Sequence, residues 1–264
     1  MTFTEFKEKY SNLNTEEERK NFINNRIKEL CKEDRQKIGL SICGGYNGFI
    51  SPNMEVVSNV SGFFPNMTMD DLSIYEEFMN YISNDTDYLS VELLTLINVQ
   101  KFVWKYFGVN SGNVLDRIEA YTTFPGNPIG ISNFKGRNVA ACSERSALVQ
   151  NILKFLGFDS EIVFGKLNEK EPHTYIVFKA EGLDTRVLYD PMNPIKYYNS
   201  LNEEKYDAAF MLLTPDMYEA LNNGSKIEFD YSLVKKVYGE NNSYNEVKRV
   251  YQSDAVLYKG SIKK

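Results

Sequence analysis

The spacing of apolar residues divides the chain into a helical first part and a later part rich in strands. Over the first 37 residues, apolar side chains recur at helical spacing among charged ones, after a cap-like run at 14–17. Similar patterns predict helices over 70–82 and 90–107, and a weaker one over 114–121. Glycine and proline punctuate residues 40–65, which we expect to form loops or short strands.

Beyond a proline- and glycine-containing loop at 125–128 the pattern changes. One helix is predicted over 142–156, with Leu148, Ile152 and Phe155 on one stripe and Gly157 as its end. Runs of β-branched and aromatic residues then predict strands at 160–167, 173–179, 186–190 and 208–214. Helices first and strands later predict an α+β protein. We divide it into a mainly helical N-terminal region, 1–85, and a mixed core with a C-terminal extension, 86–264.

The composition is that of a globular, water-soluble protein. Hydrophobic residues make up 42% and charged residues 25% of the 264 residues. With no run of about 18 apolar residues and no apolar segment near the N-terminus, we expect neither a membrane partner nor a secretory signal. The three cysteines, Cys31, Cys43 and Cys142, fit no disulfide framework, so we expect a reducing, cytoplasmic location. Phosphate and dinucleotide motifs are absent and the cysteine and histidine spacing does not suit a metal, so we expect no cofactor.

Negative charge is concentrated between Ile38 and Gln100. This stretch has eight acidic residues and no Lys or Arg, whereas the whole chain has a net charge of −6. We do not expect nucleic acid as a partner, because its phosphates need a basic footprint. The simplest interpretation of the stretch is a solvated acidic face, and the alternative is a surface that binds a cationic peptide or protein.

Three residues in the second half combine into candidate chemistry. Cys142 occupies the first position of the predicted helix, where unpaired backbone N–H groups and the helix dipole stabilise a thiolate. His173, the only histidine of the chain, begins one predicted strand, and Asp190 ends the next strand before Pro191.

A hairpin relates the histidine to the aspartate. A two-residue turn at Glu181-Gly182 would pair 180 with 183 and, counting back along both strands, His173 with Asp190. Directly opposed Cβ atoms lie about 4.5–5.5 Å apart, within reach of an imidazole–carboxylate hydrogen bond. A three-residue loop would shift the register by one residue and place the two side chains on opposite faces of the sheet. This register makes Cys142 a nucleophile, His173 its base and Asp190 the group that orients the imidazole, although each could also be structural.

Four segments together resemble the transglutaminase-like superfamily. They are 138–158, 161–165, His173-Thr-Tyr and Leu188-Tyr-Asp190-Pro191. The resemblance covers roughly residues 90–195, and its helix–strand portion also looks like arylamine acetyltransferases and the leader peptidases of lasso-peptide clusters. It departs at Ala140, where glycine is common, and at Tyr175, where tryptophan is commoner.

This resemblance implies a papain-like α+β core with an antiparallel sheet and a Cys-bearing helix. It also implies acyl transfer from an amide of a peptide or protein substrate, through a thioester on Cys142 that water or an amine resolves. The backbone N–H of Cys142 is the natural first donor to the oxyanion. The second donor is left open among four side chains: Asn133, Asn138, Gln100 and Trp104.

Two other interpretations compete with this one. The first is a papain arrangement of Cys43, His173 and Asn193, which is disfavoured because Cys43 precedes Gly-Gly-Tyr-Asn-Gly, a run that does not hold a helix. The second is a non-catalytic transglutaminase-like module that presents the acidic surface to a basic protein partner.

Overall fold

The computed structural model describes residues 1–34, 46–52, 54, 67–82, 92–109, 113–125, 128–183 and 185–254. They mix helices with an antiparallel sheet, which confirms the predicted α+β class. The chain divides into two compact units. Unit 1 comprises Met1–Gly39 and Gly48–Ser160, and unit 2 comprises Leu40–Asn47 and Glu161–Lys264. The boundary predicted between residues 85 and 86 lies outside the described residues.

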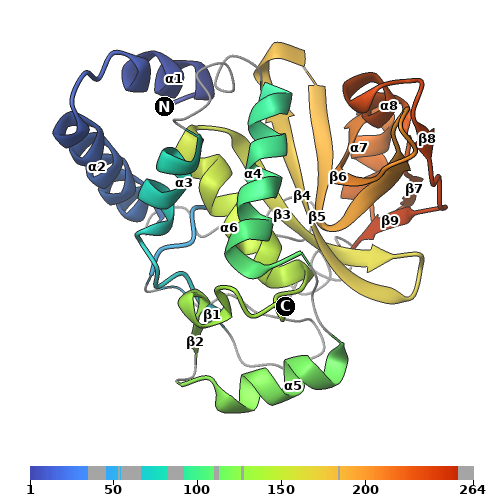
Figure 1. Cartoon of the computed structure of the whole chain (residues 1–264), viewed down its shortest axis with the longest axis horizontal. Helices are drawn as coiled ribbons and strands as arrows, with labels where there is room; N and C mark the ends of the chain where they lie inside the picture. Colours follow the sequence, from blue (N-terminus) through green and yellow to red (C-terminus); the bar gives the residue numbers. More distant parts are fainter. Residues whose placement is uncertain are drawn as a thin grey trace. The chain divides into compact units, whose positions relative to one another are not determined.

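Unit 1 is helical (Figure 1). Its elements are α1 (Phe3–Ser11), α2 (Glu16–Asp34), α3 (Ile74–Ile82), α4 (Glu92–Phe107), α5 (Val114–Thr123), α6 (Cys142–Leu156), a 3-10 turn at Ile131–Phe134, and the parallel pair β1 (Met67–Thr68) and β2 (Ile129–Gly130). The helix predicted over 142–156 is confirmed at both ends. Helix α3 begins later than predicted, because Asp71 accepts hydrogen bonds from the backbone N–H and the hydroxyl of Ser73 ahead of the helix.

Helix α6 is the centre of unit 1 and contacts α1, α2 and α4. It is buried on all sides rather than along one stripe, and its buried residues include polar ones. Two of these polar side chains, Gln150 and Asn151, form hydrogen bonds with the backbone of unit 1. Asn151 bonds the backbone N–H and C=O of Ile50 at 2.8 and 2.9 Å, and Gln150 donates to the carbonyls of Gly48 and Ser160. The segment around Ile50 is therefore held against the helix.

Unit 2 is built on an antiparallel sheet with strand order β6-β5-β4-β3-β9-β7, and β8 pairs with β5 (Figure 1). The strands are β3 (Asp159–Leu167), β4 (Glu171–Ala180), β5 (Thr185–Tyr198), β6 (Glu204–Leu213), β7 (Lys226–Glu228), β8 (Ser243–Tyr244) and β9 (Val250–Ser253), with helices α7 (Pro215–Asn222) and α8 (Ser232–Tyr238). Val177, Leu188 and Met211 lie in its apolar core. The strands predicted near 160–167, 173–179 and 208–214 are present.

Strand β5 is longer than predicted. We expected it to stop before Pro191, but it continues to Tyr198, and its register with β6 shifts between Asp190 and Ile195. Proline has no N–H to give to a sheet, so a strand that contains Pro191 and Pro194 must leave the regular ladder there. The result is a bulge over residues 191–194, which redirects the chain directly after Asp190.

The register predicted for the β4–β5 hairpin is wrong by two residues. Ala180 pairs with Thr185 and Val177 with Leu188, because a 3-10 turn at Glu181–Leu183 makes the connection longer than two residues. A shift of two preserves the face on which each side chain lies. His173 and Asp190 therefore stay on one face, as diagonal rather than directly opposed neighbours.

Candidate active site

His173 and Asp190 form a buried hydrogen-bonded pair in unit 2. Nε2 of His173 lies 2.8 Å from Oδ2 of Asp190, and the two residues are 5% and 1% exposed. An ionised carboxylate only accepts hydrogen bonds, so Nε2 carries the proton of this contact. Any proton exchange between this imidazole and a third group must then use Nδ1.

The Asp190 carboxylate accepts several other hydrogen bonds. Oδ1 accepts from the backbone N–H groups of Met192 and Asn193 at 3.0 and 3.1 Å. Oδ2 accepts from Nδ2 of Asn193 at 3.0 Å and from the hydroxyl of Tyr251 at 2.8 Å. Burial raises the pKa of Asp190, but the charge of His173 and the hydrogen bonds outweigh burial and hold it well below its usual range. Asp190 is therefore an anion at neutral pH.

The bulge that follows Asp190 is held by Arg249. Its two terminal nitrogens donate to the carbonyls of Asn193 and Pro194 at 2.6 and 2.8 Å. Sequence reasoning missed both Arg249 and Tyr251, because Tyr251 lies on β9 and Arg249 directly before it, far beyond the segments that carry the resemblance. Tyr251 follows Asp190 by 61 residues and is one of 18 tyrosines, so nothing in the sequence distinguishes it.

Cys142 is the first residue of α6 in unit 1, as predicted, and is half-buried. The residue before it, Ala141, has no side-chain oxygen to cap the helix. Instead the carboxylate of Glu144 accepts the backbone N–H of Ala141 at 2.8 Å. Glu144 is fully buried, pairs with Arg117 at 3.3 Å and accepts the hydroxyl of Tyr121 from α5.

A second buried charge fixes the chain just ahead of the cysteine. Nε of Arg145 donates to the carbonyl of Ala140 at 3.0 Å, and Nη2 donates to the carbonyl of Gly108 at 2.8 Å. Both polar groups of the Ala140–Ala141 peptide are thus hydrogen-bonded: its N–H to Glu144 and its carbonyl to Arg145. None of these supporting residues was predicted.

The structure brings together two of the three predicted triad residues. His173 and Asp190 are in contact, and Asn193 of the papain alternative lies beside them, with its Nδ2 3.4 Å from Nε2 of His173. The role of Cys142 as the nucleophile that works with this pair stays a prediction. Cys43 lies outside the described residues.

The four candidates for a second oxyanion donor all belong to unit 1. Nδ2 of Asn133 donates to the carbonyl of Gly130 at 3.1 Å, within its own turn, which argues against that residue. Asn138 is exposed with φ 55°, Gln100 is buried on α4, and Trp104 is half-buried on the same helix. The second donor therefore stays open among these three.

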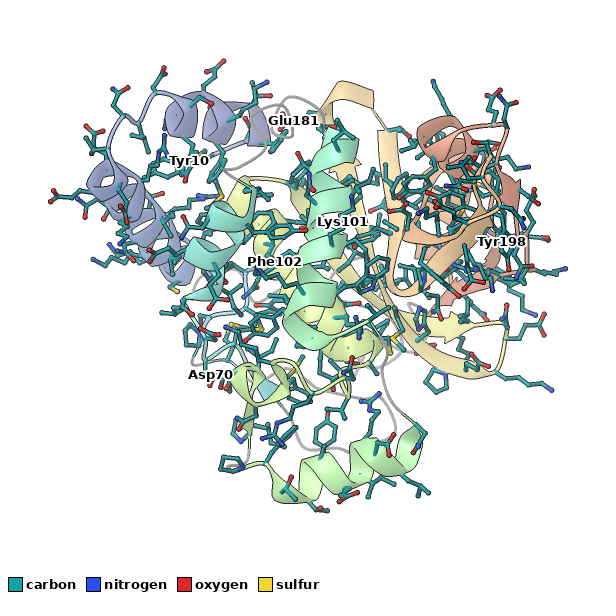
Figure 2. All side chains as sticks on the ribbon, viewed as in Figure 1. Tyr10, Asp70, Lys101, Phe102, Glu181 and Tyr198 are labelled. Atoms are coloured by element: carbon teal, nitrogen blue, oxygen red, sulfur yellow. The ribbon has the colours of Figure 1, made fainter. Side chains whose placement is uncertain are left out.

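Three carboxylates of the acidic stretch make contacts inside unit 1. Asp70, labelled in Figure 2, accepts both the backbone N–H and the hydroxyl of Ser132. Lys20 pairs with Glu76 at 3.4 Å, and Lys135 pairs with Glu77 at 2.7 Å. These carboxylates serve the fold of unit 1, which weakens the alternative of an acidic docking face.

The part of the chain that the structure describes has no group of three or more His, Cys, Asp and Glu residues suited to a metal ion. It also has no helix that is both long and apolar enough to cross a bilayer. Comparisons with protein-family models, with curated proteins and with solved structures gave no match. The transglutaminase-like resemblance thus rests on the residues themselves.

Proposed function

We propose that this protein is a thiol-dependent enzyme that transfers the acyl group of a peptide or protein amide, or hydrolyses that amide, through a thioester on Cys142. The observation that carries the proposal is the buried contact of 2.8 Å between His173 and Asp190. An imidazole whose Nε2 is held by an ionised carboxylate is the usual support of a thiol nucleophile. In a chain with a single histidine, this pairing has no second candidate.

The start of α6 supplies the other half of the proposal. A thiol at the first position of a helix of 15 residues faces N–H groups without intrahelical partners and the positive end of the dipole. Both favour the thiolate over the thiol. The backbone N–H of Cys142, held in place by the braced residues before it, is suited to receive the oxyanion of a tetrahedral intermediate.

The proposed reaction uses these groups in order. Nδ1 of His173 takes the thiol proton, and the Cys142 thiolate attacks the amide carbonyl carbon to form a tetrahedral oxyanion. When that intermediate collapses, the C–N bond breaks and the imidazolium returns its proton to the leaving amine, which leaves a thioester. Water or a second amine, deprotonated by the same imidazole, then attacks the thioester and releases Cys142. Asp190 stays ionised throughout and stabilises the imidazolium.

The test is the rate at which each cysteine is alkylated by iodoacetamide as a function of pH, read by mass spectrometry. We expect Cys142 to react rapidly well below pH 7, and Cys31 and Cys43 to gain reactivity only near the ordinary thiol range of about 8.5. His173→Gln should abolish the reactivity of Cys142 below pH 7, whereas the matched control Tyr238→Phe should preserve it. Ordinary behaviour of Cys142 in the wild-type protein would reject the proposal and favour the binding module. Rapid reaction of Cys43 would instead favour the papain arrangement.

A further inference from the structure

Strand β9 and the residue before it bring two buried side chains to Asp190 and to the bulge that follows it. Tyr251 is fully buried and donates its hydroxyl to Oδ2 of Asp190 at 2.8 Å, on the same oxygen that His173 contacts. Two positions earlier on the chain, Arg249 holds the carbonyls of the bulge. Tyr251 thus reaches the aspartate, and Arg249 the bulge beside it, from a segment that is distant in sequence.

We infer that Tyr251 is a positioning residue for the imidazole of His173, acting through Asp190. By fixing Oδ2, its hydroxyl keeps the histidine proton on Nε2 and leaves Nδ1 as the basic nitrogen. The inference rests on the proposed function for its purpose, since a base is of use only if a nucleophile needs one. The three residues involved, His173, Asp190 and Tyr251, all belong to unit 2.

The sheet itself fixes the place of the Tyr251 hydroxyl. The backbone of Tyr251 pairs with Leu167 of β3 on one side and with Ile227 of β7 on the other. Its ring meets the ring of Tyr175 edge-on, with 5.2 Å between centroids, and both rings lie beside the imidazole at 6.2 and 6.3 Å. A ring held from both strands and packed against aromatic neighbours has little freedom to withdraw its hydroxyl.

The hydroxyl acts as a donor over the whole physiological pH range. Burial, followed by the negative charge of Asp190, raises the pKa of Tyr251 well above its ordinary value, against the opposing effect of Arg249. A protonated phenol beside an ionised carboxylate can only donate to it. Oδ2 of Asp190 consequently accepts from Tyr251 and His173 at 2.8 Å each, and from Nδ2 of Asn193 at 3.0 Å.

The single histidine makes the inference directly measurable. In ¹⁵N-labelled full-length protein, the two imidazole nitrogens of His173 give one set of signals, and their chemical shifts report which nitrogen carries the proton of the neutral ring. We expect the Nε2–H tautomer to dominate in the wild-type protein. Tyr251→Phe removes one hydroxyl and preserves the ring, and should lower the ratio of the Nε2–H to the Nδ1–H tautomer by about threefold or more. The matched control, Tyr238→Phe, loses a hydroxyl that donates to the carbonyl of Ala208 and should leave the ratio unchanged.

The result stands apart from the proposed function. An unchanged tautomer ratio in Tyr251→Phe would overturn the inference, whether or not Cys142 is reactive. If Cys142 is inert and the ratio still falls, the tyrosine positions the histidine and the proposed chemistry is what fails. If Tyr251→Phe does not fold, the inference can be tested on the wild-type protein alone. The Tyr251 hydroxyl proton and the Nε2 proton of His173 approach the same oxygen, so a nuclear Overhauser effect should join them, and its absence would refute the arrangement.

Discussion

Glu144 accepts the backbone N–H of Ala141 at 2.8 Å and thereby fixes the Ala140–Ala141 peptide, one residue ahead of Cys142. A fully buried carboxylate is costly unless it is paired, and here Arg117 and Tyr121 of α5 provide the pairing. The position of the thiol thus depends on a charged cluster that joins two helices of unit 1.

This cluster predicts a large loss of stability when Glu144 is removed. Glu144→Ala should lower the free energy of unfolding by about 3 kcal/mol, because it deprives Arg117, Tyr121 and the Ala141 N–H of a shared buried acceptor. Glu144→Gln retains an acceptor oxygen without the charge, and should cost about 1–2 kcal/mol. Urea unfolding measures both values. Glu119→Ala, an exposed glutamate on α5, is the control, with a change below about 0.5 kcal/mol. A loss for Glu144→Ala no larger than the control's would show that the cluster does not stabilise unit 1.

The depressed pKa of Asp190 predicts how stability depends on pH. A carboxyl whose pKa is lower in the folded protein contributes stability that is fully present above its unfolded pKa, about 3.9, and is lost as the pH falls toward the folded value. The asparagine side chain in Asp190→Asn cannot titrate. The free energy of unfolding of this variant should therefore be about 3 kcal/mol below that of wild type at pH 7, and the difference should be about 1 kcal/mol smaller at pH 3. Urea unfolding at the two pH values tests this. An equal loss of stability for Asp190→Asn at both pH values would contradict the prediction.

Local patterns were enough to predict the elements that carry the site. The helix of Cys142 has an apolar repeat and a glycine at its end, and the strand of His173 is rich in β-branched and aromatic residues, so each is encoded by adjacent residues. The contact of His173 with Asp190 was predicted through a register that is wrong by two. It survived because a shift of two preserves the face of the sheet.

Long-range partners could not be predicted in the same way. Tyr251 reaches Asp190, and Arg249 the bulge after it, only because β9 returns to pair with β3, and a pairing of such sequence separation leaves no periodic trace in one sequence. The bulge after Asp190 was interpreted as a strand end, since proline usually stops a strand. The same holds for Glu144, because its partners Arg117 and Tyr121 lie on another helix and nothing in the sequence links them to it.

The close approach of β3 to β9 predicts that Gly165 tolerates no side chain. A Cβ at Gly165 would lie 1.8 Å from the carbonyl oxygen of Gln252, a backbone atom that cannot move aside. Gly165→Ala should therefore lower the free energy of unfolding by about 2–3 kcal/mol, and should disturb the His173 tautomer ratio because β9 carries Tyr251. Gly136→Ala is the control. It meets nothing within 4 Å and has a φ of +71°, so only backbone strain of about 1 kcal/mol is expected. Equal losses for the two variants in urea unfolding would refute this packing of β3 on β9.

The last turn of α6 depends on a residue from the N-terminal helices. Nε and Nη2 of Arg26, on α2, donate to the carbonyls of Phe155 and Lys154 at 3.3 and 3.1 Å. These carbonyls lie in the last turn, where the regular bonds of the helix end, and the Lys154 carbonyl also accepts the N–H of Gly157. Arg26 is buried, and its positive charge faces the negative end of the helix dipole. Arg26→Met keeps the length of the side chain but donates nothing, and should cost about 2 kcal/mol in urea unfolding. Lys28→Met, an exposed change on the same helix, should cost less than about 0.5 kcal/mol. If both variants unfold like wild type, α2 does not support the helix that begins at Cys142, and the N-terminal region must serve another purpose.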